Sequence, residues 1–131
     1  MIAFLKKYWI TTTIILIVLI LCFMDTTQLP KAPTINFDKF VHIVMFSGVS
    51  GVIFFDNSLY LRFPISNKRI FWGSFFFPVM LGGLIEIMQE KYLAPTRSGD
   101  WFDFLFDVVG TLIGLSIIIL INRRLPFTRK T

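Results

Sequence analysis

Charge is scarce in this chain of 131 residues. Only 16% of the residues are charged, and long uncharged runs separate them, whereas 55% are hydrophobic and 16 are Phe. Soluble domains carry about 25% charged residues, so this composition excludes an ordinary soluble protein and indicates an integral membrane protein. The length allows one domain, which we take to be residues 1–131.

Cysteine is almost absent, since Cys22 is the only one and lies inside the first apolar run. A single cysteine excludes an internal disulfide and is typical of a small buried hydrophobe. The N-terminal segment MIAFLKKYWITTTIILIVLIL resembles a signal peptide, but no small-x-small cleavage site follows it. We therefore predict that this segment is a retained helix.

Histidine-rich and nucleic-acid-binding motifs are also missing. Without an HExxH-type spacing we predict no cofactor, and a divalent metal on His42 and nearby carboxylates stays an alternative. The net charge of +5 comes from basic residues at the ends of the apolar runs. Membrane orientation explains such residues better than a nucleic-acid partner, and the predicted partner is the lipid bilayer.

Four apolar segments approach the ~20 residues that a membrane-spanning helix needs. They cover residues 8–24, 40–55, 70–92 and 101–122, and the segments between them contain Pro, Asn and Gly. The sequence thus predicts an all-α integral membrane protein with four transmembrane helices. Nine of the 13 Lys and Arg lie in the N-terminal segment, the second loop and the tail, so we expect both termini to be cytoplasmic.

This topology directs one group of polar residues toward the outer face of the membrane. Glu86 lies six residues inside Tyr92, about 9 Å along a helix, and Asp107 lies six residues inside Trp101. His42 follows Asp38 by one turn. Residues from three different helices are therefore predicted to form one polar layer, with the residues of each helix spaced to share a face.

The predicted outer layer has more acids than bases. Its six acids and three bases are Asp38, Glu86, Glu90, Asp100, Asp103 and Asp107, and Lys39, Lys91 and Arg97. An unpaired buried charge is costly, so either some carboxylates are protonated or a cationic or hydroxyl-rich ligand binds there. The structural alternative is a polar plug in which Arg97, Gln89 and His42 complete a hydrogen-bond network.

If the layer is catalytic, we expect Glu86 and Asp103 to be its acid–base pair, Arg97 to orient the substrate or an ionised partner, and His42 to relay protons. The other polar residues of the layer are predicted to bind the substrate: Asp38, Gln89, Asp100 and Asp107. Asp56, near the inner end of the second helix, is expected to face the cytoplasm.

Two further function classes compete with this hypothesis. Protonatable acids at such a depth are also typical of a transport or proton-coupling protein, but few polar residues continue toward the inner face. Gly110 with Gly114, and Ser47 with Gly51, are small-xxx-small pairs that let helices approach closely. A structural membrane partner without chemistry would assemble through such pairs.

The polar residues together resemble the signature of the VanZ-like family of small bacterial membrane proteins, named for a protein associated with teicoplanin resistance. The resemblance rests on FDKFVH at 37–42, E-x2-Q at 86–89, Arg97, and D-x2-D-x3-D-x2-G-x3-G from Asp100 to Gly114. It implies a multi-pass protein of the bacterial cytoplasmic membrane that binds or modifies a cell-envelope precursor, lipid or glycopeptide. Asp107 departs from the pattern, because the family commonly has Asn there.

Overall fold

The computed structural model describes residues 2–24, 37–60, 65–92 and 100–124, and every element within these ranges is helical. The predicted all-α fold class is confirmed. In chain order the elements are α1 (Ile2–Lys7), α2 (Trp9–Phe23), α3 (Phe37–Tyr60), α4 (Asn67–Ile70), the π-helix η1 (Phe71–Phe76), α5 (Phe77–Tyr92) and α6 (Trp101–Arg124).

Three helical segments are long and apolar enough to cross a membrane: 37–59, 67–92 and 101–124. The first apolar run is shorter, because the backbone leaves the helical conformation at Tyr8, which separates α1 from α2. The 15 residues of α2 span about 22 Å, less than the ~30 Å of a bilayer hydrocarbon core. The prediction of four apolar helices therefore holds, but only three of them have full spanning length.

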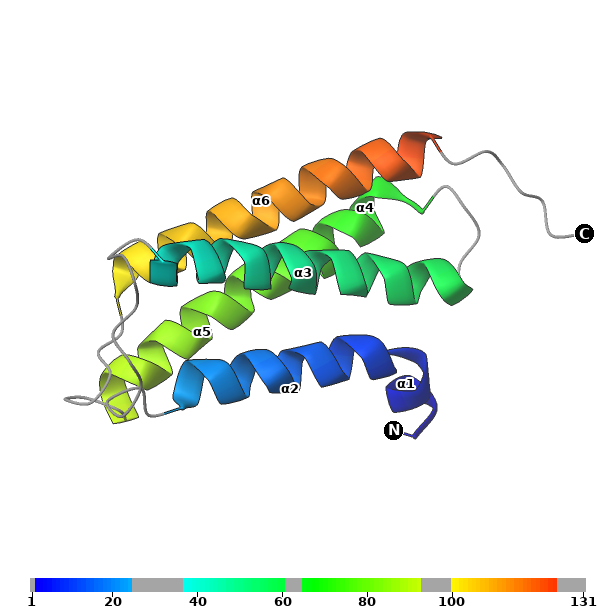
Figure 1. Ribbon diagram of the computed structural model, residues 1–131. Helices are drawn as coiled ribbons and strands as arrows, with labels where there is room; N and C mark the ends of the chain where they lie inside the picture. Colours follow the sequence, from blue (N-terminus) through cyan, green and yellow to red (C-terminus); the bar gives the residue numbers. More distant parts are fainter. Residues whose placement is uncertain (1, 25–36, 61–64, 93–99, 125–131) are drawn as a thin grey trace, which may run out of the picture.

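The four main helical segments lie antiparallel to their neighbours in sequence, with α3 and α6 side by side and the α4–η1–α5 segment crossing them obliquely (Figure 1). We call one end of the bundle the acidic end, defined by Asp38, Glu86, Asp103 and Asp107. We call the opposite end the basic end, defined by Lys68, Arg69, Arg123 and Arg124. The described chain begins and ends at the basic end.

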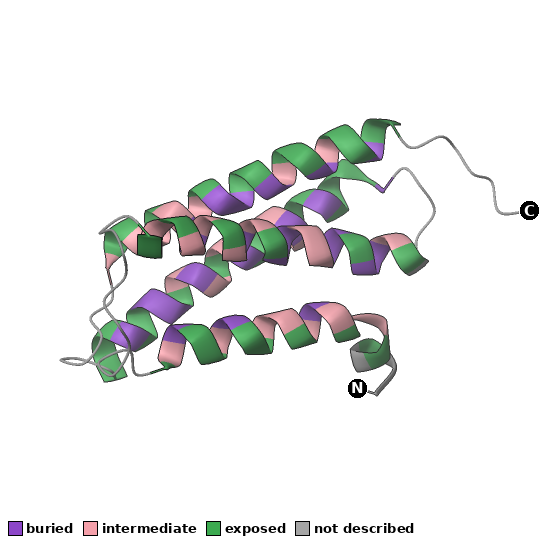
Figure 2. Ribbon diagram, viewed as in Figure 1, coloured by how far each residue is buried: buried purple, intermediate pink, exposed green. Residues whose placement is uncertain are grey.

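The closest helix contact is between α3 and α6, and glycine permits it. A Cβ atom at Gly110 would lie 2.8 Å from the Cα of Ile43, and one at Gly114 would lie 2.9 Å from the carbonyl oxygen of Ser47. Larger residues would push the two backbones apart, as in other small-residue interfaces of membrane helices. The buried faces of the helices point toward one another and the exposed faces point outward (Figure 2).

The π-helix η1 is explained by the proline that follows it. Pro78 has no N–H to donate to the carbonyl of Ser74 four residues earlier, so the regular helical pattern cannot continue there. The hydroxyl of Ser50 on α3 donates to this carbonyl at 2.6 Å instead. Ser50 and Ser74 are both buried, and their contact joins the middle of α3 to the spanning segment 67–92.

The short helix α2 is held at both of its ends by side chains from other helices. Asp56 of α3 accepts a hydrogen bond from the Thr11 backbone N–H (2.9 Å) in the first turn of α2. Gln89 of α5 donates to the carbonyl of Cys22 (2.7 Å) in its last turn. The expectation that Asp56 faces the cytoplasm is therefore wrong, because this side chain is fully buried as a cap for α2.

Candidate functional site

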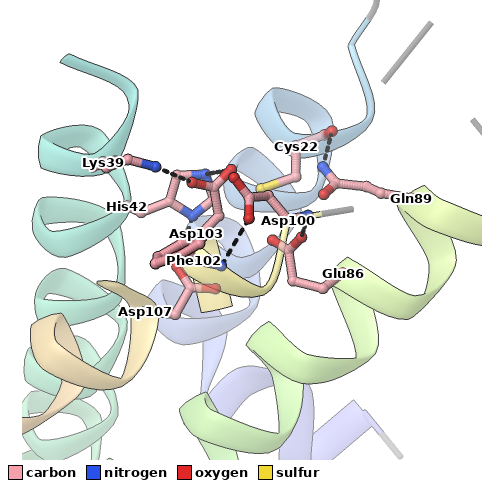
Figure 3. A network of polar contacts seen from close by, with 9 residues as sticks. All are labelled: Cys22, Lys39, His42, Glu86, Gln89, Asp100, Phe102, Asp103 and Asp107. Atoms are coloured by element: carbon pink, nitrogen blue, oxygen red, sulfur yellow. Dashed lines mark hydrogen bonds and ion pairs between the residues drawn. The ribbon is translucent and has the colours of Figure 1, made fainter. Parts of the chain in front are cut away.

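A short polar contact at the acidic end joins His42 of α3 to Asp107 of α6. Their Nδ1 and Oδ1 atoms are 2.7 Å apart, and both side chains are almost completely buried (Figure 3). The contact depends on the close approach of α3 and α6 at Gly110, one turn further along α6. An ionised Asp107 would accept the Nδ1–H proton and hold the imidazole ring in one orientation.

Asp103 connects the other side of the imidazole to solvent. Its Oδ2 atom lies 3.9 Å from Nε2 of His42, and its Oδ1 atom lies 3.4 Å from Nζ of Lys39. Lys39 also lies over the rings of Phe102 and Phe106, with its Nζ atom 5.8 and 5.4 Å from their centroids. The order Lys39–Asp103–His42–Asp107 is thus a chain of charged groups that runs from the half-exposed rim into the buried interior.

Glu86 comes from the third element of the site, α5. Its Oε2 atom accepts a hydrogen bond from the Asp100 backbone N–H at 2.8 Å, and its side chain is 3% exposed. Asp100 in turn uses its own carboxylate to accept the backbone N–H of Phe102 at 2.8 Å, as the N-cap of α6. The start of α6 is therefore fixed by its own cap and by Glu86.

One described residue predicted for the site, Gln89, lies apart from this chain of contacts. Gln89 is buried, but its amide nitrogen donates to Cys22 of α2. Arg97 falls outside the described residues. Asp38 is exposed at the rim, within reach of His42 and Asp103. The proposed acid–base roles of Glu86 and Asp103 stay predictions, as do the substrate-binding roles of Asp38, Gln89, Asp100 and Asp107.

Two contacts of the site were not predicted from the sequence. Lys39 was predicted as one of the three bases of the layer, but its ion pair with Asp103 was not. Gly82 leaves the space that the Asp107 carboxylate occupies, because a Cβ atom there would lie 2.7 Å from Oδ2 of Asp107. In the sequence, the position of Gly82 four residues before Glu86 gave only a weak indication of this contact.

The buried carboxylates at the acidic end are only partly satisfied. Within the described part of the chain, Oε1 of Glu86 and Oδ2 of Asp107 are buried and have no hydrogen-bond partner. Four carboxylates lie close together there, and the only Lys or Arg that forms an ion pair with any of them in the described residues is Lys39. Buried, unpaired acceptors of this kind favour a bound cation, proton or hydrogen-bond donor.

Two overlapping groups have the spacing to hold a metal ion. The ligand atoms of Asp38, His42 and Asp103 lie within 4.8 Å of one another, and so do those of His42, Glu86 and Asp107. One imidazole with carboxylate oxygens is a donor set that suits Zn²⁺ or Mn²⁺. In the first group Asp107, through its contact with Nδ1 of His42, would hold the imidazole in the orientation that metal binding needs.

The arrangement has the parts needed for acid–base chemistry. An imidazole oriented through Nδ1 leaves Nε2 to accept or deliver a proton on the side that faces Asp103. Glu86 and Asp103 approach this group from different helices, so a ligand that entered at the rim would meet several proton carriers.

No known family model, characterised protein or solved structure was found to match the chain.

Proposed function

We propose that the chain is a VanZ-like protein of the bacterial cytoplasmic membrane that binds or modifies an envelope component or glycopeptide through its acidic end. Three membrane-length helices support the location in a membrane. The observation that carries the proposed function is the buried His42–Asp107 pair, with Nε2 of His42 directed toward Asp103 at the rim.

The distribution of charge supports an outward-facing site. Lys68, Arg69, Arg123 and Arg124 all lie at the basic end, and cytoplasmic ends of membrane helices are enriched in such residues. The acidic end would then face the outside of the cell. Envelope precursors and glycopeptides carry hydroxyl, amine and amide groups that donate hydrogen bonds to carboxylates and imidazole.

In the proposed mechanism, the ligand enters beside Asp38 and Asp103 and donates a hydrogen bond to the acidic end. His42 relays a proton between this ligand and the carboxylates, with Asp107 stabilising the imidazolium form. Glu86 and Asp103 act as the acid–base pair. A divalent cation on the same residues is the second candidate, because it would satisfy the unpaired oxygens of Glu86 and Asp107.

The interior of the bundle does not favour the transport alternative. Between His42 and Asp56, the buried face of α3 carries Phe46, Val49 and Ile53. Ser50 is the polar residue of that stretch, and its hydroxyl is bound to the Ser74 carbonyl. Along the buried face of α3 the polar groups of the two ends are therefore separated mainly by apolar side chains, as expected for a site that opens to one face only.

Teicoplanin susceptibility tests the proposal directly. We expect a susceptible bacterium that produces the wild-type protein to tolerate severalfold more teicoplanin than the host alone, and His42→Gln to abolish this protection. Thr13→Ala is the matched control, because this exposed hydroxyl contacts only the Trp9 carbonyl of its own helix. Wild-type protein that reaches the membrane without changing susceptibility would refute the glycopeptide proposal, and protection by His42→Gln would remove this residue from the mechanism.

A further inference from the structure

A second candidate site lies at the basic end, away from the acidic residues. A pocket of about 700 Å³ opens between α1–α2 on one side and α3, α4, η1 and the start of α5 on the other. Most of its wall is apolar, with Ile15, Trp72 and Phe77 among the lining residues, and its polar residues come from the start of α2, the end of α3 and the α4 region. The wall is therefore amphipathic, and nothing in the proposed function uses it.

The cationic part of the pocket comes from α4. Lys68 and Arg69 both line it, and both are exposed. No carboxylate within the described residues forms an ion pair with either of them. Asp56, the acid on the neighbouring stretch of α3, is fully buried; its Oδ2 atom accepts the Thr11 backbone N–H, its Oδ1 atom has no partner in the described residues, and it does not line the pocket. The two cations are thus left to attract an anion at the mouth of the pocket.

The polar wall contains one hydroxyl that the fold does not satisfy. Tyr8 donates to Asn57 (3.0 Å), and Thr12 donates to the Tyr8 carbonyl (2.8 Å), so these groups are engaged. Thr11 is only 7% exposed, lines the pocket, and has no partner for its Oγ1 atom in the described residues. A buried hydroxyl without a partner costs free energy unless a ligand or water completes it.

We propose that this pocket binds an anionic phospholipid of the leaflet at the basic end. The phosphate lies between Lys68 and Arg69, the Thr11 hydroxyl donates to an oxygen of the headgroup or ester region, and an acyl chain lies along Trp72 and Phe77. Charge complementarity selects the headgroup, and the apolar wall selects an amphiphile over a free anion. Basic pockets between membrane helices are suited to such headgroups because both parts of the lipid are accommodated.

The test measures thermal unfolding of the purified full chain in an uncharged detergent, with added phosphatidylglycerol, phosphatidylcholine or inorganic phosphate. Saturating phosphatidylglycerol is expected to raise the melting temperature by about 4–8 °C. Phosphatidylcholine and inorganic phosphate are expected to change it little. An equal rise with phosphatidylcholine would overturn headgroup recognition, and an equal rise with inorganic phosphate would show an anion site instead of a lipid site.

Matched variants separate the pocket from general attraction to the basic end. The double change Lys68→Gln with Arg69→Gln is expected to abolish the phosphatidylglycerol shift, while Arg123→Gln with Arg124→Gln removes equal charge from exposed positions on α6 and retains it. Thr11→Val is expected to melt normally without lipid and to show a reduced shift with it. Equal losses in the two double variants, or a full shift in Thr11→Val, would contradict the proposal.

Discussion

The two ends of the bundle both bury carboxylates among apolar helices, but the polar and charged groups around these carboxylates differ. At the basic end, Asp56 is the one buried acid of the described residues. Its Oδ2 atom caps the first turn of α2, so one carboxylate joins two helices, and its Oδ1 atom has no hydrogen-bond partner there. At the acidic end, the Glu86 and Asp107 carboxylates each make one short hydrogen bond, yet they lie beside Asp103 and Asp38. Among the described Lys and Arg, Lys39 alone forms an ion pair in this group, and its partner is Asp103.

This difference separates a structural acid from a candidate functional one. A single buried carboxylate that satisfies a helix terminus contributes to folding by itself. Several carboxylates in one layer repel one another and lose solvation, which the fold does not require. We infer that the acidic end is retained for what it binds or does, while Asp56 is retained for the attachment of α2.

The largest expected difference between the two ends is their accessibility from outside the cell. In a Cys22→Ala background, Glu90→Cys and Asn67→Cys place exposed thiols at the acidic and basic ends, respectively. A membrane-impermeant maleimide is expected to label Glu90→Cys in intact cells and Asn67→Cys only after permeabilisation. The reverse pattern would show that the acidic end faces the cytoplasm.

The close contact between α3 and α6 is expected to show the next largest effect of substitution, because this contact brings His42 to Asp107. Gly110→Ala is expected to lower the free energy of unfolding by about 1–3 kcal/mol or more, since the new methyl group meets the backbone of Ile43. Gly48→Ala is the control, because nothing lies within 4 Å of a Cβ atom there. Unfolding in detergent measures both, and equal stability of the two variants would contradict the close packing.

Substitutions of Asp56 test whether this carboxylate stabilises the attachment of α2. Asp56→Ala leaves the Thr11 N–H without its acceptor and is expected to cost about 1–3 kcal/mol in the free energy of unfolding. Asp56→Asn keeps an oxygen acceptor and should cost less. Unfolding measurements on both variants check this order. A stable Asp56→Ala variant would show that α2 does not depend on this cap.

Much of the fold followed from hydropathy, because apolar runs of membrane length have few alternatives to helices. The predicted segments 40–55 and 101–122 correspond to α3 and α6, which extend a few residues further into the polar flanks. The break at Tyr8 was not predicted, since the sequence there carries neither Pro nor Gly.

The polar layer was predicted more completely than its pairings. Helical spacing fixes which residues of one helix share a face, and the predicted topology placed Glu86, Asp103 and His42 at the same end. It does not fix which atoms meet across helices, so the 2.7 Å contact between His42 and Asp107 was not anticipated. The expectation that Asp56 faces the cytoplasm was wrong for the same reason. A side chain that caps another helix shows no pattern in its own stretch of sequence.

Glu86→Gln tests whether the acidic end is kept for function or for stability. The amide retains an acceptor for the Asp100 N–H but removes one negative charge from the acidic end. The measurement is thermal unfolding of the purified variant and wild type in the same detergent at neutral pH. If the acidic end serves function, the variant should melt at the same or a higher temperature, because functional charge is often kept at a cost to stability. A loss of about 3–5 kcal/mol would instead identify Glu86 as part of a structural ion-pair network and contradict the account.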